Sequence, residues 1–203
     1  MKALIPSLIL LAPMGAFAAD DAGVGLGFEV GTSYFLPSQA PGNKGMGNFF
    51  GIDLNVGALT VGYYFENLNI KLKDNNDNGP LASQIDVAAN INEIRLIKPI
   101  IKEVAIGLGI GTADVKGKVT VNGTSLAVGP AFDTLAPVAD IFARITPISG
   151  GDKVKAAVNV TLGYRFIAIN STVVNGAGAA TDFADAIDNL NGFRVGLSVG
   201  IAF

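Results

Sequence analysis

The sequence lacks three residue types: it has no cysteine, no histidine and no tryptophan. Without cysteine, the chain forms no disulfide and offers no thiolate nucleophile. Without histidine, it has no imidazole to act as a general base or to bind a transition metal. No motif supports a Ser–Lys or paired-carboxylate site in their place. We therefore predict that the protein is not an enzyme and that it uses no cofactor and no metal.

Long apolar runs are also absent after the first eighteen residues. The mean hydropathy of +0.47 is high, yet no later segment offers the roughly 18 apolar residues that a membrane-spanning helix needs. The apolar residues instead alternate with small or polar ones, among 26 glycines, which is typical of a transmembrane β-barrel. The alternative is a secreted soluble β-sandwich or lipocalin-like barrel. The face opposite the apolar one is rich in Gly, Ser, Asn and charge, which would make a poor packed core.

The N-terminus has the pattern of a secretory signal peptide. Lys2 supplies a positive start, residues 4–14 are mostly apolar, and Ala16-Phe17-Ala18 fits a small-x-small cleavage site. We predict a cleaved signal peptide at residues 1–18 and a single barrel domain at 19–203, a retained N-terminal anchor being the alternative. Loss of Lys2 would change the net charge from −3 to −4. This mild acidity argues against nucleic acid as a partner, which requires a basic stripe.

The last eleven residues, 193–203, form the clearest strand. Side chains of a strand alternate between its two faces, and here one face is apolar while the other carries Arg194 with small or polar residues. Roughly ten residues also suffice for a tilted strand to cross a bilayer. The apolar face comprises Phe193, Val195, Leu197, Val199, Ile201 and Phe203.

Seven further segments show the same alternation, which gives eight strands. Their connections alternate between short turns, at Gly57-Ala58, Lys98-Pro99 and Gly150-Gly151, and long polar or Gly-rich loops. An even strand number with this alternation is typical of bacterial outer-membrane barrels, in which the short turns lie in the periplasm. The predicted strands are 24–36, 48–56, 59–73, 83–97, 100–116, 138–145, 153–169 and 193–203.

The apolar pattern predicts that two of these strands change phase along their length. In 59–73 the apolar set passes from Tyr63 and Phe65 to Leu68, Ile70 and Leu72, and one extra residue near Glu66-Asn67 would produce this as a β-bulge. A similar slip is predicted between residues 91 and 94.

Three loops carry signals of their own. Asn122-Gly123 predicts the turn of a small hairpin, and residues 181–189 have the capping and spacing of a short amphipathic helix. Residues 74–82 resemble half of a calcium loop, but the distant glutamate that completes such a loop is missing.

The whole mature chain resembles the small eight-stranded outer-membrane β-barrel proteins of the OmpA-barrel, OmpX and OmpW type. The resemblance is most specific in the strand 193–203 with its terminal Phe203. It implies an all-β, antiparallel up-and-down barrel in the outer membrane, with short periplasmic turns and long extracellular loops. It further implies that this strand is read by the barrel-assembly machinery, that lipid and lipopolysaccharide surround the barrel, and that the protein is a monomer.

The alternation directs ten charged side chains into the lumen. One interpretation is a mutually paired network that fills the barrel, since unpaired charges in a narrow interior carry a large desolvation cost; its members are Glu29, Asp53, Glu66, Glu93, Arg95, Asp140 and Arg144. The other three, Lys71, Arg165 and Arg194, are predicted to form a basic outer mouth that attracts anionic solutes or lipopolysaccharide phosphates. The first interpretation favours a structural or surface-interaction role. The alternative is a narrow OmpW-like channel for small or hydrophobic molecules, because the inward face is poor in bulk.

Overall fold

The computed structural model describes residues 24–38, 43–73, 83–121, 124–125, 132–151, 154–169 and 190–203. The predicted signal peptide, the half calcium loop and the short helix at 181–189 lie outside these residues. Nine strands are assigned within them: β1 Val24–Pro37, β2 Lys44–Val56, β3 Leu59–Lys73, β4 Ser83–Ile101, β5 Val104–Val121, β6 Thr124–Ser125, β7 Phe132–Gly150, β8 Lys155–Ile167 and β9 Gly192–Ala202. Among the residues described, no helix is long and apolar enough to cross a bilayer.

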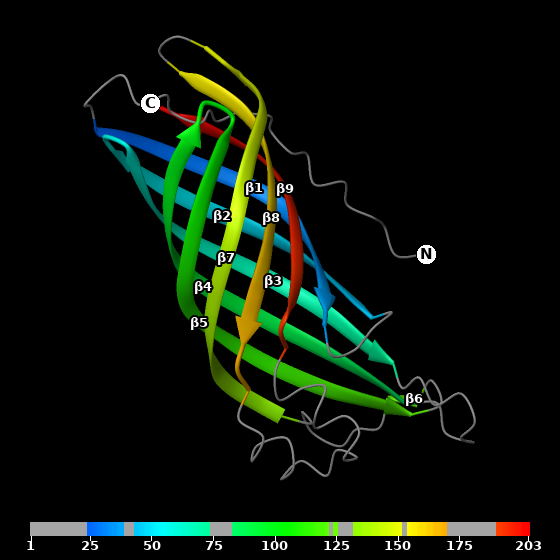
Figure 1. Ribbon diagram of the computed structural model, residues 1–203. Helices are drawn as coiled ribbons and strands as arrows, with labels where there is room; N and C mark the ends of the chain where they lie inside the picture. The colour runs from blue at the N-terminus through cyan, green and yellow to red at the C-terminus, as the bar shows by residue number, and fades with distance from the viewer. Residues whose placement is uncertain are drawn as a thin grey trace.

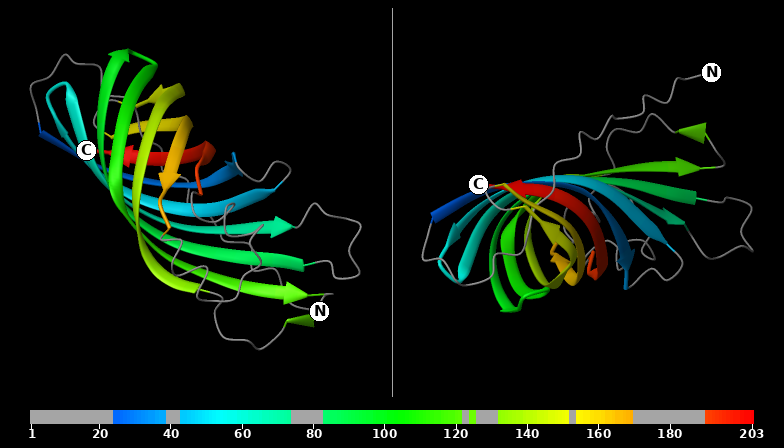
Figure 2. Two further views of the ribbon diagram at one scale, coloured as in Figure 1. Left: turned by 60° about the horizontal axis from the view of Figure 1, so that its bottom comes forward. Right: turned by 90° about the horizontal axis from the view of Figure 1, so that it is seen from above.

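Eight long strands close into one antiparallel barrel, as predicted. Each pairs with its neighbours in the chain, β9 pairs with both β8 and β1, and β4 pairs with both β3 and β5. The chain ends at the end of the barrel where the short turns lie, which we call the short-turn end (Figure 1). We call the opposite end, where β3, β5 and β8 stop, the long-loop end. The strands are strongly tilted and coiled around the lumen (Figure 2).

The predicted small hairpin is present as an extension of β5. Thr124 pairs with Val121, and Ser125 pairs with Thr120. β6 is therefore a two-residue addition at the long-loop end rather than a ninth strand of the barrel wall.

Several predicted boundaries are wrong, because strands continue through residues that usually mark turns. β2 begins at Lys44 rather than Asn48, and β4 runs through Lys98-Pro99 to a turn at Lys102-Glu103. The predicted sixth strand, 138–145, is the middle of the much longer β7. The register shifts once between Pro99 and Ile101 and once between Ile145 and Ile148, on either side of Pro147. Proline has no N–H to donate to the ladder, so it interrupts the pairing without ending the strand.

The predicted bulge at Glu66-Asn67 is also wrong. The β3 register with both β2 and β4 is continuous across these residues, so Leu68, Ile70 and Leu72 point into the lumen and are buried. The slip predicted in β4 is also absent, because the β4 register is continuous through residues 91–94. Val87, Ala89 and Ile91 therefore point inward and are buried.

Both wrong predictions have one cause: the outward side chains of β3 and β4 change from apolar to polar toward the long-loop end, while the inward ones change from polar to apolar. From the short-turn end to mid-barrel, the outer wall is apolar, with side chains such as Tyr63, Phe65 and Ile94 exposed. Toward the long-loop end of β3 and β4, the outer wall becomes polar, and Asn67 donates a 2.6 Å hydrogen bond to Asn90 across the two strands. The outer face of these strands is thus apolar along one part and polar along the other, while the backbone ladder continues unbroken.

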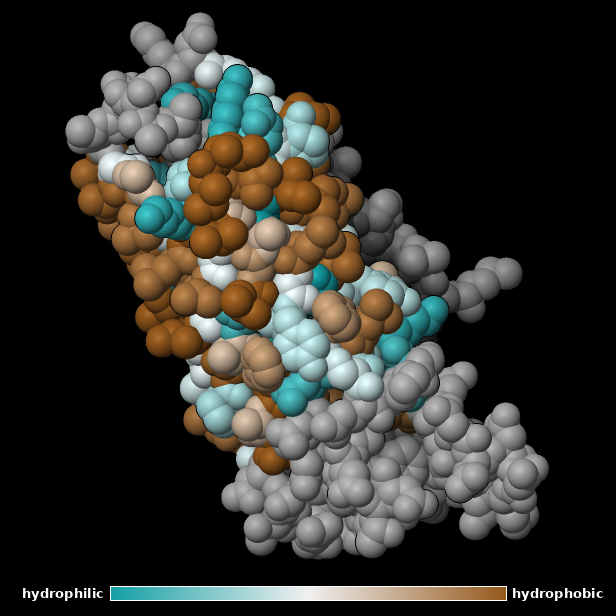
Figure 3. All heavy atoms as spheres, in the orientation of Figure 1, coloured by the Kyte–Doolittle hydropathy of each residue, from teal (hydrophilic) through white to brown (hydrophobic). Residues whose placement is uncertain are grey.

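The surface and the interior follow this pattern. In the view of Figure 3, apolar residues dominate the barrel wall from near the short-turn end to mid-barrel and mix with polar residues farther down. The interior has an apolar cluster toward the long-loop end and a band of charged side chains nearer the short-turn end. The apolar cluster consists of Phe35, Leu68, Ile70, Leu72, Val87, Ala89, Ile91, Ala113, Val115, Ala136, Val138, Ile167, Ile169 and Leu190.

Candidate functional site

The charged side chains inside the barrel form one continuous network, which we call the lumen network. Every long strand except β5 contributes to it. Its charged members are Glu29 on β1, Asp53 on β2, Glu66 on β3, Glu93 and Arg95 on β4, Asp140 and Arg144 on β7, Arg165 on β8 and Arg194 on β9. Nearly all are buried, although each lies on a strand whose other face is exposed.

β5 contributes space instead of charge. Its inward positions beside the network are Ala105, Gly107, Gly109 and Gly111. A side chain added at Gly109 would meet the carboxylate of Glu93, and one added at Gly107 would meet the ring of Phe142. The glycines of this strand therefore let the side chains of its neighbours cross the lumen.

Arg165 is the centre of the part of the network nearer the long-loop end. Its Nη1 lies 2.8 Å from Glu66 Oε2, and its Nη2 lies 2.9 Å from Asp140 Oδ2 and 3.3 Å from Glu93 Oε2. Its side chain has no exposed surface. One guanidinium thus joins carboxylates from β3, β4 and β7, with the forked geometry that arginine provides.

Arg194, on the closing strand, binds two of the same carboxylates. Its Nη1 lies 3.3 Å from Asp140 Oδ2, and its Nη2 lies 3.3 Å from Glu66 Oε2. The hydroxyl of Ser33 also donates to Glu66. The seam between β9 and β1 is therefore held by side chains as well as by the backbone ladder.

Arg95 connects the two parts of the network. Its Nη2 lies 2.7 Å from Glu93 Oε2, and its guanidinium carbon lies 4.0 Å from the centre of the Tyr64 ring. A buried guanidinium above an aromatic face gains a cation–π interaction in addition to its ion pair.

The part nearer the short-turn end is built around Tyr64 and Glu29. The Tyr64 hydroxyl donates to Glu29 Oε2 at 2.5 Å and lies 2.9 Å from Asp53 Oδ2, while Arg144 Nη2 lies 2.8 Å from Glu29 Oε2. Ser198 also donates to Glu29. Arg144 is the one guanidinium that pairs with both Glu29 and Asp53, the second through a longer 3.6 Å contact.

Sequence reasoning missed the role of Tyr64. Its inward position follows from the alternation of β3, but a lone inward tyrosine carries no motif. Two glycines beside Tyr64 were the sequence feature that could have indicated its role. Side chains added at Gly51 or Gly62 would collide with the Tyr64 ring. These glycines flank Tyr64 on the neighbouring strand and on its own.

The predicted basic outer mouth is not formed by the three residues expected to build it. Lys71 is exposed on the outer wall, because β3 has no bulge and its phase is therefore opposite to the predicted one. Arg165 and Arg194 do point into the lumen, but both are buried within ion pairs rather than open at the mouth. Together with Arg95 they balance Glu66, Glu93 and Asp140.

The carboxylates of the lumen network are bound by side chains of the same chain. They accept bonds from arginine, tyrosine and serine groups. Within the part of the chain that the structure describes, no group of three or more acidic side chains is placed to hold a metal ion. The arrangement instead joins seven strands across the barrel, a structural role for which buried, mutually bound charges are suited.

Comparison with known proteins identifies the fold and nothing finer. No family model matches the sequence, and no curated protein matches it. Among solved structures, the chain is similar to Ail, the attachment invasion locus protein of Yersinia pestis, crystallised with the heparin analogue sucrose octasulfate. The TM-score is 0.52 and the identity 10%, over 89% of this chain and 99% of that one.

Two other solved structures have lower scores. Neisserial surface protein A has a TM-score of 0.37 at 11% identity, covering 88% of this chain and 95% of that one. OprG of Pseudomonas aeruginosa has a TM-score of 0.41 at 10% identity, covering 95% and 98%.

Proposed function

We propose that this chain, which has the fold of the small eight-stranded outer-membrane β-barrels, is a structural or surface-interaction barrel of the bacterial outer membrane, closed to solutes and without enzymatic activity. One observation carries the proposal. The Arg165 side chain has no exposed surface and is bound to Glu66, Glu93 and Asp140. A guanidinium held in this way fills the lumen where a channel would need water.

The rest of the network supports closure at a second level. Tyr64, Glu29 and Arg144 join β3, β1 and β7 nearer the short-turn end. A solute would have to separate buried ion pairs at both levels, and breaking such a pair leaves an uncompensated buried charge. Eight strands leave an interior only wide enough for side chains to fill.

The apolar outer wall of the barrel supports the proposed membrane location. Large apolar side chains such as Leu108 and Ile110 are exposed on it, at 57% and 68%, and a soluble protein rarely exposes a continuous apolar band. In this proposal the short turns face the periplasm and the long connections face outward. The surrounding partners are outer-membrane lipid and lipopolysaccharide, the assembly machinery reads β9, and the protein functions as a monomer.

Conductance across a planar bilayer tests the closed lumen. We expect the refolded protein to give no current steps above the bare membrane. The double variant Arg165→Ala/Arg194→Ala removes two of the three guanidiniums that bind Glu66, Glu93 and Asp140. It should raise the current, which shows that the assay is sensitive. Discrete current steps from the unmodified protein would contradict the closed-barrel proposal.

A narrow channel for hydrophobic molecules remains the second candidate, and one observation favours it. The lumen toward the long-loop end is lined by apolar side chains, including Leu68, Ile70 and Val87. Such a lining would suit an apolar molecule entering from outside. Vesicle uptake of a hydrophobic dye separates the two candidates: the closed barrel gives the rate of protein-free vesicles, whereas the channel gives a faster rate.

A further inference from the structure

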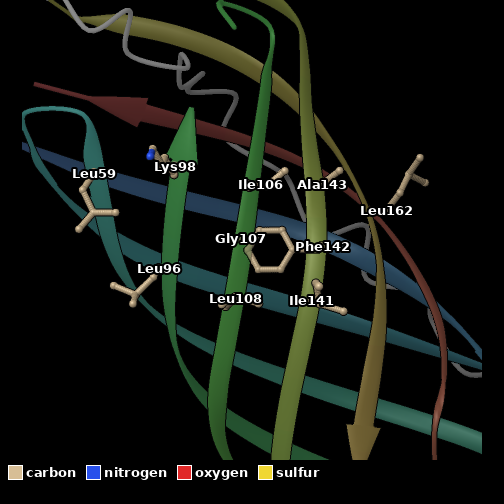
Figure 4. Close-up of a pocket in the computed structure, with 10 residues that line it drawn as sticks. All are labelled: Leu59, Leu96, Lys98, Ile106, Gly107, Leu108, Ile141, Phe142, Ala143 and Leu162. Atoms are coloured by element: carbon tan, nitrogen blue, oxygen red, sulfur yellow. The ribbon is translucent and has the colours of Figure 1, made fainter. Parts of the chain in front are cut away.

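An apolar groove lies on the outer wall of the barrel, outside the lumen network. It has a volume of about 590 Å³ and is lined mainly by outward side chains of β3, β4, β5, β7 and β8. Gly107 and Phe142, whose side-chain positions are inward, complete the lining, and Figure 4 shows the Phe142 ring beside Gly107. This volume is within the usual range for small-molecule sites.

The sheet register explains where the groove forms. One row of the lining runs across β4, β5, β7 and β8, where each residue pairs with the next. It consists of Lys98, Ile106, Ala143 and Leu162. Leu96, Leu108 and Ile141 make the next row toward mid-barrel. Ala143 is the smallest outward side chain in the lining, and Gly107 adds none, so the wall is hollow between taller neighbours.

One end of the groove carries a positive charge. Lys98 is the one charged residue among the ten that line it, and it is exposed on the outer wall. It lies four residues before the turn at Lys102-Glu103, about 13 Å along the strand. A lysine at this position extends its amine toward the membrane interface while its methylene stem covers apolar surface.

We propose that this groove binds one phospholipid of the periplasmic leaflet, with an acyl chain along the apolar rows and the anionic headgroup at Lys98. Hydrocarbon matches the leucine and isoleucine lining, and the phosphate matches the single cation. The short-turn end faces the periplasm in the proposed orientation, so the headgroup and Lys98 lie at the same interface. Basic groups beside apolar surfaces near a membrane interface are typical of lipid headgroup recognition. This inference rests on the proposed membrane location, but not on whether the lumen is closed.

Fluorescence quenching by brominated lipids tests the site, because the chain has no tryptophan of its own. We would place a single tryptophan in the groove with Leu96→Trp and a reference tryptophan on β9 with Val199→Trp. Each protein is refolded into vesicles that contain a small fraction of lipid brominated on its acyl chains. That lipid carries either a phosphatidylglycerol or a phosphatidylcholine headgroup. The ratio of the two quenching strengths at one position cancels the depth of the reporter.

The expected result is a preference for the anionic lipid at the groove alone. One lysine near the surface corresponds to about a fivefold preference, so Leu96→Trp should show a ratio near five and Val199→Trp a ratio near one. Adding Lys98→Gln should reduce the groove ratio to near one. Lys102→Gln in the adjacent turn is the matched control and should leave the ratio high, while Ala143→Phe should reduce quenching by filling the groove.

Two results would overturn the proposal. Equal ratios at both reporters would mean that the groove contacts only bulk lipid, and an unchanged ratio after Lys98→Gln would remove the headgroup site. An absence of quenching at both reporters would overturn the membrane location together with the lipid site. Strong quenching at both reporters without a preference for the anionic lipid at the groove would overturn the lipid site alone.

Discussion

Asp140 on β7 and Arg165 on β8 are direct partners in the sheet, and their side chains form a 2.9 Å ion pair inside the lumen. The same guanidinium nitrogen also lies 3.3 Å from Glu93 on β4. The pair therefore links a local contact between adjacent strands to a contact across the barrel. Arg165 contributes to the closure of the barrel as well as to the pairing of two strands.

Arg165→Ala should be strongly destabilising. It would leave Glu66, Glu93 and Asp140 with Arg95 and Arg194 as their remaining partners, and removing one member of a buried ion pair costs about 3–5 kcal/mol. The free energy of unfolding can be measured by urea titration in detergent micelles, followed by circular dichroism. Lys71→Ala is the control, because Lys71 is exposed on the outer wall and should change stability by less than about 0.5 kcal/mol. Equal losses for the two variants would mean that the network does not stabilise the barrel.

The part of the network nearer the short-turn end has two carboxylates for one guanidinium, and the two should differ in importance. Glu29 accepts bonds from Tyr64, Arg144 and Ser198, whereas the Arg144 contact of Asp53 is longer, at 3.6 Å. Glu29→Gln should therefore cost about 2–3 kcal/mol, since it weakens several charge-assisted hydrogen bonds. Asp53→Asn should cost less than about 1 kcal/mol, because it also removes repulsion between two nearby carboxylates. The same urea titration measures both, and a larger loss for Asp53→Asn would contradict the assigned roles.

The sequence was sufficient to predict the barrel, because period-two alternation and the positions of the loops are local properties. It placed nine of the ten predicted inward charges on the correct face, all except Lys71. It failed at Leu68 and Lys71, where the pattern inverts while the backbone continues. A sequence change from apolar to polar on one face is the same whether the strand bulges or leaves the membrane.

The partners of Arg165 and Arg194 could not be predicted from alternation. Which carboxylates they meet depends on the stagger between strands and on the reach of each side chain across the lumen. Glu66 and Arg165 are 99 residues apart in the chain, and no local signal records that separation. The sequence predicts an inward face that is poor in bulk, but the side chains that fill the space beside Gly107, Gly109 and Gly111 come from other strands.

Gly51→Ala tests whether the Tyr64 ring is held in place by the small residue opposite it. An added Cβ at Gly51 would meet the ring of Tyr64, and overpacking of this kind costs about 1–3 kcal/mol. Gly150→Ala is the matched control, because a Cβ there meets nothing within 4 Å. Thermal unfolding in micelles should show a lower midpoint for Gly51→Ala alone. A lower midpoint for Gly150→Ala as well would mean that the loss reflects glycine replacement in general.

Cysteine labelling tests the proposed membrane location and its boundary on β3, and the absence of native cysteine gives a clean background. Phe65 and Asn69 both face outward on β3, about 13 Å apart along the strand. In whole cells, a membrane-impermeant maleimide should modify Asn69→Cys, which lies on the polar part of the wall. It should leave Phe65→Cys unmodified, because lipid covers that position. Labelling of both would place the membrane boundary nearer the short turns, and labelling of neither would mean that the polar amides of β3 lie within the lipid or under other chain segments.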